Sequence, residues 1–444
     1  MKKYNYIIVC ALFLALTSCS EFLDIKPVGK VIPTTAEEYR SLLAKAYKTI
    51  PSDKGLANFR SDEMKVSADD NDQNSYGFLE NWDDASINTT NASFSWQFYY
   101  RVIYIANQVI ENAGNIKSTD VAVVNQLVGE SYLLRAYMHF TLVNLHGEPY
   151  TLGGGPASKS IPLMKDADLE KSRFRDTVSD VYASVLSDIS AAKELINVDR
   201  WEPSFSYRFN KTSVDALESR VNLYMGKWQV ALDAAQRVLA TDYKLVDMNE
   251  ELAVLPNHYT SSENIAASEA PISSNVQRGA LAPAQFLTKY SEDDLRLTKY
   301  FALEAEENGD RKSVKAGSDA FKTTFRLGEF VVTAAEAAAE LGQVDLAKAS
   351  LLDLAKNRYT NEGYQAVQVQ LKEMNKDELI DFIHDERARE LAFEGHRWFD
   401  LRRTTRQQII KVIDGVSYEL KKDDPRYTIP IPRDATQANP NLSL

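Results

Sequence analysis

Cysteine is almost absent from this 444-residue chain, and the two cysteines present, Cys10 and Cys19, both lie near the N-terminus. The chain after Cys19 therefore has no thiol for a disulfide, a zinc thiolate site or a cysteine nucleophile. Positive charge is also scarce, because 51 lysines and arginines face 63 acidic residues, a formal net charge of −12, and no basic run occurs. This balance argues against nucleic acid as a partner.

The sequence signatures of common catalytic sites are missing as well. None of the five histidines has HExxH or facial-triad spacing, and there is no G-x-S-x-G, phosphate-loop or G-x-G-x-x-G motif. Residues 69–74 offer oxygen ligands for calcium, but counting from Asp70 an EF-hand would need glycine at Ser75 and glutamate at Asn81. We predict no enzyme activity, no cofactor and no metal, and we interpret residues 69–74 as a solvated acidic loop.

The N-terminus has the pattern of a bacterial lipoprotein signal. Two lysines follow Met1, and residues 7–16 form an apolar run that is long enough for a signal peptide but too short to span a membrane. The run leads into Leu-Thr-Ser-Cys, which resembles a lipobox and ends at Cys19. We predict that residues 1–18 are removed, that Cys19 carries acyl chains such as palmitate, and that residues 19–33 tether the body to a membrane. The alternative is an ordinary secretion signal with an incidental cysteine.

The rest of the chain has the hydrophobic periodicity of helices. Thr35, three residues before a glutamate, has the pattern of a capping box, and Thr177 precedes another helix with a clear apolar face. Further helices are predicted over roughly residues 98–113 and 121–145, the second ending at Gly147. We therefore expect an all-α, mainly helical body.

Two later stretches resemble each other and have the pattern of helical hairpins. In each, an apolar helix ends at a glycine, Gly226 or Gly342. Five positions later stands a small residue, Ala231 or Ala347, against which a second helix can pack closely. This pattern is typical of tetratricopeptide repeats, and the distance between the two stretches indicates that insertions interrupt any array.

Three segments break the helical pattern: about residues 60–95, 147–175 and 241–325. Residues 241–325 contain three prolines and many serines, threonines and asparagines. Binding residues concentrate on such loop-rich segments over a rigid scaffold. No interdomain linker is evident, so we predict a single domain over residues 34–444.

Several motifs along the chain together match the pattern of one known family. The strongest match is RARELAFEGHRWFDLRR at residues 387–403. The other matching residues are CSEFLDIKP at 19–27; Trp96, Tyr99, Ile103, Ala106 and Asn107; Leu134, Arg135, Ala136, Tyr137, Phe140, Leu142, Gly147 and Pro149; and IPIP at 429–432 with NPNL at 439–442. By these motifs, and by their order along nearly the whole chain, the sequence resembles the SusD/RagB family of nutrient-binding outer-membrane lipoproteins of Bacteroidetes.

The resemblance implies a SusD-like fold, in which tetratricopeptide-like hairpins support a loop-rich ligand-binding region. It implies an outer-membrane lipoprotein, facing the cell exterior, that binds a nutrient without chemistry and delivers it to a SusC-like TonB-dependent transporter. The implied ligand is usually a glycan; the chain is shorter than expected for starch-binding members, and a peptide, as in the RagB branch, is the alternative. A glycoside hydrolase is a third hypothesis.

The strongest motif also holds a dense charged set: Glu386, Arg387, Arg389, Glu390, Glu394 and Arg397. Paired carboxyl groups could serve glycoside hydrolysis. However, the arginines match the carboxylates in number and would hold them ionised, whereas a general acid must stay protonated. We therefore interpret the set as an ion-pair network that joins the last helices to the others.

Sugar binding needs an aromatic face for the apolar side of a pyranose, with amide and carboxylate groups for its hydroxyls. The segment at residues 60–95 offers this combination, and two further aromatic residues lie in other irregular stretches. The predicted ligand-binding residues are Asp70, Tyr76, Asn81, Trp82, Trp201 and Tyr259. An aromatic residue in a loop can also be a packing anchor, and that alternative stays open for each.

Overall fold

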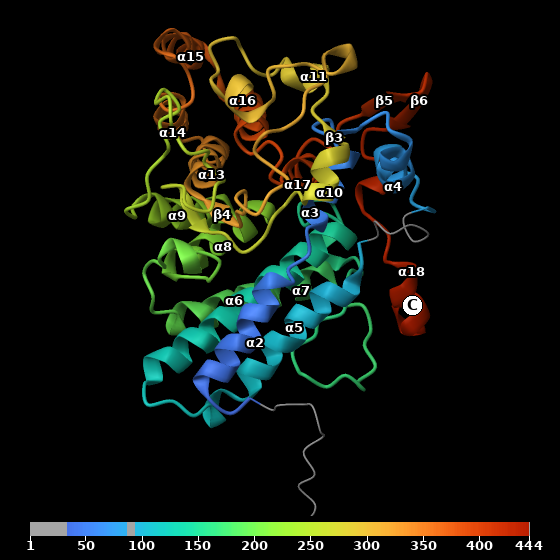
Figure 1. Ribbon diagram of the computed structural model, residues 1–444, viewed down its shortest axis with the longest axis vertical. Coiled ribbons are helices and arrows are strands. Elements are labelled where there is room, and N and C mark those ends of the chain that lie inside the picture. The colour runs from blue at the N-terminus through green and yellow to red at the C-terminus, as the bar shows by residue number, and fades with distance from the viewer. Residues whose placement is uncertain (1–32, 87–93, 444) are drawn as a thin grey trace, which may run out of the picture.

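The computed structural model describes residues 33–86 and 94–443. Within these ranges the chain is mainly helical, as predicted (Figure 1). The long helices are α2 (Ala36–Lys48), α5 (Trp96–Glu111), α6 (Val121–His146), α7 (Val178–Leu195), α8 (Lys211–Tyr224), α9 (Trp228–Leu239), α13 (Leu327–Glu340), α14 (Val344–Ala355), α15 (Asn361–Glu373) and α16 (Lys376–Glu390). The predicted signal peptide, Cys19 and all but the last residue of the predicted tether lie outside the described residues.

These helices pack in sequence order. α6 packs against α5 and α7, α8 packs against α9, and α13 packs against α9, α14 and α16. In Figure 1, α2, α5, α6 and α7 form a group at the bottom of the molecule, and α8, α9, α13, α14 and α15 continue from it up one side. The long helices thus form a scaffold along one flank of the protein.

The caps of the helices confirm the predicted helix starts. Thr35 accepts a hydrogen bond from the Glu38 backbone N–H at 3.3 Å, and the Glu38 carboxylate accepts one from the Thr35 N–H at 3.0 Å, which completes a capping box. Thr177 forms the same motif with Asp180 at the start of α7. The predicted helices at residues 98–113 and 121–145 are α5 and α6, and Gly147 caps the end of α6.

The two predicted glycine-ended hairpins are α8–α9 and α13–α14. Gly226 and Gly342 have φ angles of +67° and +76°, in the left-handed region that favours glycine at the end of a helix. Ala231 and Ala347 are fully buried where the second helix of each hairpin packs. The tetratricopeptide-like pairing is therefore confirmed.

Short elements occupy the side of the molecule away from α9 and α14 (Figure 1). The helices there and in the connections are α3 (Asp53–Ala57), α4 (Asp70–Glu80), α10 (Ser274–Gly279), α11 (Ala284–Leu287), α12 (Arg296–Tyr300), α17 (Arg397–Arg403) and α18 (Arg433–Ala438). The strands are β1 (Lys65–Val66), β2 (Asn264–Ala266), β3 (Ala280–Leu281), β4 (Phe325–Arg326), β5 (Ile409–Ile413) and β6 (Val416–Leu420). The described strands pair antiparallel as β1–β3, β2–β4 and β5–β6.

The prediction of a loop over residues 60–95 is wrong in part. Asp69 accepts hydrogen bonds from the backbone N–H groups of Asn71 and Asp72 and so caps α4, which covers most of the supposed acidic loop. Acidic residues at the start of a helix are favourable because its N-terminus carries partial positive charge. Residues 147–175 and 241–325 are largely irregular, as predicted, with short helices and strands between the loops.

A buried ion-pair network joins α16 to its neighbours, as the charged motif predicts. Glu390 accepts hydrogen bonds from Arg326 at 2.6 Å, from Arg358 at 2.9 Å and from Arg296 at 3.0 Å, and all four side chains are buried. Burial alone would raise the pKa of Glu390, but Arg358 and Arg326 outweigh it and hold the pKa well below its usual value. The carboxylate is therefore a fixed structural anion.

The main cluster of buried apolar side chains includes residues from Ala36 to Leu442. It therefore draws on both the long helices and the short elements.

Within residues 33–86 and 94–443, no helix combines the length and the apolar character that a membrane span requires. The division of the chain into one domain over residues 34–444 stays a prediction.

Candidate functional site

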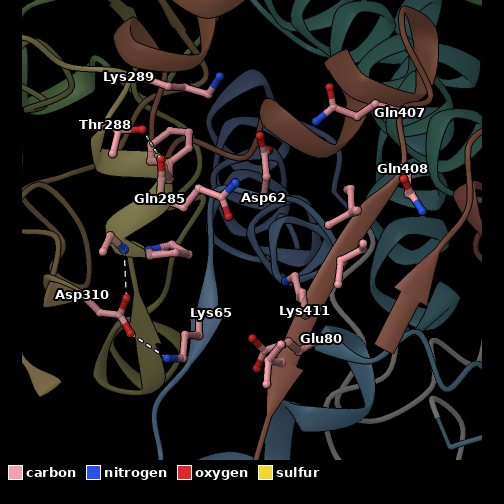
Figure 2. A pocket seen from close by; sticks show the side chains of 16 residues that line it. Asp62, Lys65, Glu80, Gln285, Thr288, Lys289, Asp310, Gln407, Gln408 and Lys411 are labelled. Atoms are coloured by element: carbon pink, nitrogen blue, oxygen red, sulfur yellow. Dashed lines mark hydrogen bonds and ion pairs between the residues drawn. The ribbon is translucent and has the colours of Figure 1, made fainter. Parts of the chain in front are cut away.

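A pocket of about 680 Å³ opens between β5, the segment around α11, β1 and the end of α4 (Figure 2). Its lining residues are Asp62, Lys65, Glu80, Pro283, Ala284, Gln285, Phe286, Thr288, Lys289, Asp310, Gln407, Gln408, Ile409, Ile410, Lys411 and Val412. We call this cavity the β5 pocket. Most of its lining side chains are polar, and the aromatic ring among them, Phe286, is buried.

Ion pairs hold several of the charged lining residues. Asp62 accepts two hydrogen bonds from Arg397, both at 2.7 Å, and Lys65 contacts Asp310 at 2.6 Å. Burial alone would raise the pKa of Asp62, but Arg397 outweighs it and lowers the pKa. Asp62 is therefore an ionised acceptor at neutral pH rather than a proton donor.

Lys411 and Glu80 lie together at one end of the pocket (Figure 2). Lys411 Nζ donates to the carbonyl oxygens of Phe59 at 2.5 Å and Met64 at 2.9 Å, and Glu80 accepts the Val66 N–H at 3.0 Å. Burial lowers the pKa of Lys411 to about 8 and raises the pKa of Glu80. Each of the two groups also favours the charged form of the other, so they form an electrostatically coupled pair at this end of the pocket.

Neutral hydrogen-bonding groups complete the lining. Gln285 and Thr288 are exposed, and Thr288 donates its hydroxyl to the Gln285 carbonyl at 2.7 Å. Gln407 is half-buried, and Gln408 donates to Glu419 at 2.5 Å. In Figure 2 the amides of Gln285 and Gln407 point into the pocket from opposite sides. The pocket therefore offers amide donors and acceptors between charged groups of both signs.

The structure contradicts the prediction that Trp82 and Tyr76 present open ring faces. Trp82 is only 2% exposed, and its Nε1 donates to the Arg60 carbonyl at 3.0 Å. Tyr76 lies on α4 and stacks on Phe59, with ring centroids 5.3 Å apart. Lys411 Nζ lies 5.7 Å from the Trp82 ring centroid. Both rings are therefore packed in the interior and do not line the pocket.

The other predicted ligand-binding residues also lie outside the pocket lining. Asp70 is exposed in the first turn of α4, and Asn81 follows its last residue. Trp201 is half-buried and donates its Nε1 to a backbone carbonyl at 3.1 Å. Tyr259 is 39% exposed and stacks on His258, with centroids 5.0 Å apart. A ligand-contacting role for these four residues stays a prediction.

The sequence analysis did not predict the β5–β6 hairpin, although the sequence contains a signal for it. Asp414 and Gly415 connect the strands with φ angles of +50° and +78°, and an Asp-Gly pair between alternating residues is typical of a two-residue hairpin turn. The flanking pattern also alternates, with Ile409 buried and Ile410 and Val412 exposed. This hairpin supplies the strand that lines one side of the β5 pocket.

Glu63, which follows the pocket residue Asp62 in the chain, is buried in surroundings that favour its protonated form. It is 1% exposed, and Oε1 accepts from the Asn58 amide at 2.6 Å and the Phe393 N–H at 3.0 Å, whereas Oε2 has no partner among the described residues. Burial raises the pKa of Glu63 from 4.5 to about 8. Folding therefore opposes ionisation of this carboxyl group.

A pH series with Glu63→Gln tests this state. At pH 6 the unfolded chain has already lost the Glu63 proton while the folded chain keeps it, and the folded chain has lost only about half of it by pH 8, so stability falls as pH rises through this window. We expect the wild type to lose about 2 kcal/mol more unfolding free energy across the window than the variant does. Urea unfolding at pH 6, 7 and 8 measures the difference, and parallel pH profiles would contradict the prediction.

Comparison with known families gives two matches that together span most of the chain. Residues 21–223 match the profile of a family described as "Starch-binding associating with outer membrane". Residues 256–443 match the profile of a family described as "SusD family". The matched ranges include α4, α11 and both strands of the hairpin beside the pocket.

Individual proteins show similarity over almost the full length. SusD-like protein P38 of Formosa agariphila is 23% identical, over 94% of this chain and 95% of its own. A SusD superfamily protein from Bacteroides thetaiotaomicron has the same fold, with a TM-score of 0.76 at 21% identity, covering 92% of this chain and 99% of its own. A laminarin-binding SusD-like protein matches with a TM-score of 0.60 at 19% identity, covering 84% of this chain and 92% of its own.

Proposed function

Because the chain belongs to the SusD family, we propose that it binds an oligosaccharide in the β5 pocket without transforming it. The observation that carries this proposal is the set of groups around the pocket. Sugar hydroxyls both donate and accept hydrogen bonds, and the amides of Gln285 and Gln407, the Thr288 hydroxyl and the ionised Asp62 meet both needs. A laminarin-binding protein with the same fold supports a glycan as the ligand.

The state of the carboxyl groups supports binding without hydrolysis. Glycoside hydrolysis uses one protonated and one ionised carboxyl group on either side of the scissile bond. Burial raises the pKa of Glu80, as a general acid requires. However, the Glu80 carboxyl group accepts a hydrogen bond from the backbone N–H of Val66 and is therefore engaged in the structure. Asp62 and Asp310, which could serve as the second group, are engaged by Arg397 and Lys65. The pocket is thus equipped to hold a ligand rather than to cleave it.

The proposed cellular role follows from the family and from the N-terminus. Acyl chains on Cys19 would anchor the protein in the outer membrane, with the pocket facing the cell exterior. The protein would then deliver its ligand to a SusC-like TonB-dependent transporter. The description of the family that matches residues 21–223 supports an association with the outer membrane.

Titration calorimetry tests the oligosaccharide proposal. We expect laminarihexaose or maltohexaose to bind the wild type, and Gln285→Ala to weaken that binding by about two- to tenfold, since one hydrogen bond is lost. Gln370→Ala, which removes an exposed amide from α15 far from the pocket lining, is the matched control and should bind like the wild type. No binding of either sugar, or equal losses in the two variants, would contradict the proposal.

A further inference from the structure

β5 lines the β5 pocket with its edge rather than with one face. Ile409 and Lys411 belong to one face of the strand, whereas Ile410 and Val412 belong to the other, yet all four line the pocket. No residue of β6 lines it. Figure 2 shows β5 beside the cavity, with its hairpin partner on the far side. The main chain of β5 therefore faces the pocket.

The turn determines which peptide groups of β5 point into the pocket. Ile413 pairs with Val416 across the two-residue turn, so these residues exchange backbone hydrogen bonds. Hydrogen-bonded and non-hydrogen-bonded pairs alternate along an antiparallel ladder. Val412 and Ile410 therefore direct their N–H and C=O groups away from β6, toward the open edge.

The two edges of the hairpin differ in how they are covered. On the β6 edge, the Glu419 carbonyl accepts a hydrogen bond from Arg426 at 2.7 Å, as expected for a residue whose peptide groups point away from β5. On the β5 edge, no hydrogen bond from another described residue reaches the peptide groups of Ile410 or Val412. An open strand edge of this kind is a template for a further strand.

We propose that the β5 edge binds a short extended peptide by strand addition within the β5 pocket. β5 has five residues and spans roughly 15 Å, which suits a peptide of five or six residues. The free main-chain groups recur at every second residue, and an extended peptide has the same period. The opposite wall, with Gln285 and Lys289, encloses the edge, which favours a short free peptide over a segment of a large partner.

Charge around the edge also suits a peptide. Lys411 and Glu80, whose opposite charges stabilise each other, place a donor and an acceptor beside the edge for the amide groups of one ligand. This inference depends on the main chain of β5, whereas the oligosaccharide proposal depends on the side chains of the pocket. The two can therefore fail separately.

Titration calorimetry with the capped hexapeptide TVTQVT tests the inference, with Val412→Pro as the variant. Proline at Val412 removes an N–H from the open edge and leaves the ladder to β6 intact, because Val412 and Ser417 form a non-hydrogen-bonded pair. Ser417→Pro makes the same change on the far edge of the same hairpin. We expect the peptide to bind the wild type, Val412→Pro to weaken it at least fivefold, and Ser417→Pro to stay within twofold.

A second probe covers the case in which Val412→Pro fails to fold. The same hexapeptide with every amide N-methylated cannot add as a strand, and we expect it not to bind the wild type. No binding of TVTQVT, equal losses in the two proline variants, or equal binding of the methylated peptide would each overturn the inference. Oligosaccharide binding without peptide binding would overturn this inference alone, and the reverse result would overturn the oligosaccharide proposal alone.

Discussion

Replacing Glu390 by glutamine is expected to lower the free energy of unfolding by about 3–5 kcal/mol. Glu390 is 0% exposed and accepts hydrogen bonds from Arg296, Arg326 and Arg358, which are also buried. The variant keeps the size of the side chain but removes its negative charge. Guanidinium groups stay protonated, so the buried positive charge would lose an anion that three arginines share.

The matched control for Glu390→Gln is Asp381→Asn. Asp381 lies on the same helix, α16, but is exposed to solvent. An exposed substitution away from any network changes stability by no more than about 0.5 kcal/mol. Urea unfolding at pH 7, followed by tryptophan fluorescence, measures both variants. Similar losses in the two would mean that the network does not depend on the charge of Glu390.

This network is the part of the interior that the sequence predicted best. The motif at residues 387–403 places arginines and glutamates close together, which predicted ion pairing, but the arginines that hold Glu390 lie elsewhere in the chain and could not be predicted from the motif. The helix starts at Thr35 and Thr177 were predictable in full, because a cap depends on residues three positions apart. Neighbouring residues therefore determine the caps, whereas the partners in the network depend on the fold.

The pocket could not be predicted in this way, because its walls come from distant parts of the chain. Lys65, Gln285 and Val412 become neighbours only when β1, the α11 segment and β5 come together in the fold. Composition indicated residues 241–325 as a binding segment, and that segment does supply Gln285. However, polar composition does not distinguish a loop from a capped helix, which is why residues 69–74 were assigned wrongly.

Trp82→Ala is expected to lower the free energy of unfolding by about 3–5 kcal/mol, because it leaves a cavity in the core. The ring is 2% exposed, and its Nε1 donates to the Arg60 carbonyl. The ring also lies under Lys411, so its loss should loosen that side of the β5 pocket and weaken ligand binding as a secondary effect. The sequence analysis placed Trp82 among the ligand-binding residues and left a packing anchor open, and the burial of the ring favours the packing anchor.

Tyr259→Ala is the informative comparison for Trp82→Ala, since it also removes an aromatic ring that was predicted to contact the ligand. Tyr259 is 39% exposed, and its ring packs on His258 at the surface, so we expect a loss below about 1 kcal/mol. Urea unfolding with parallel calorimetric titration separates stability from binding in both variants. A stable Trp82→Ala protein with lost affinity would restore Trp82 as a ligand contact. A strongly destabilised protein, with binding that recovers when Trp82 is replaced by phenylalanine, would establish it as the support behind Lys411.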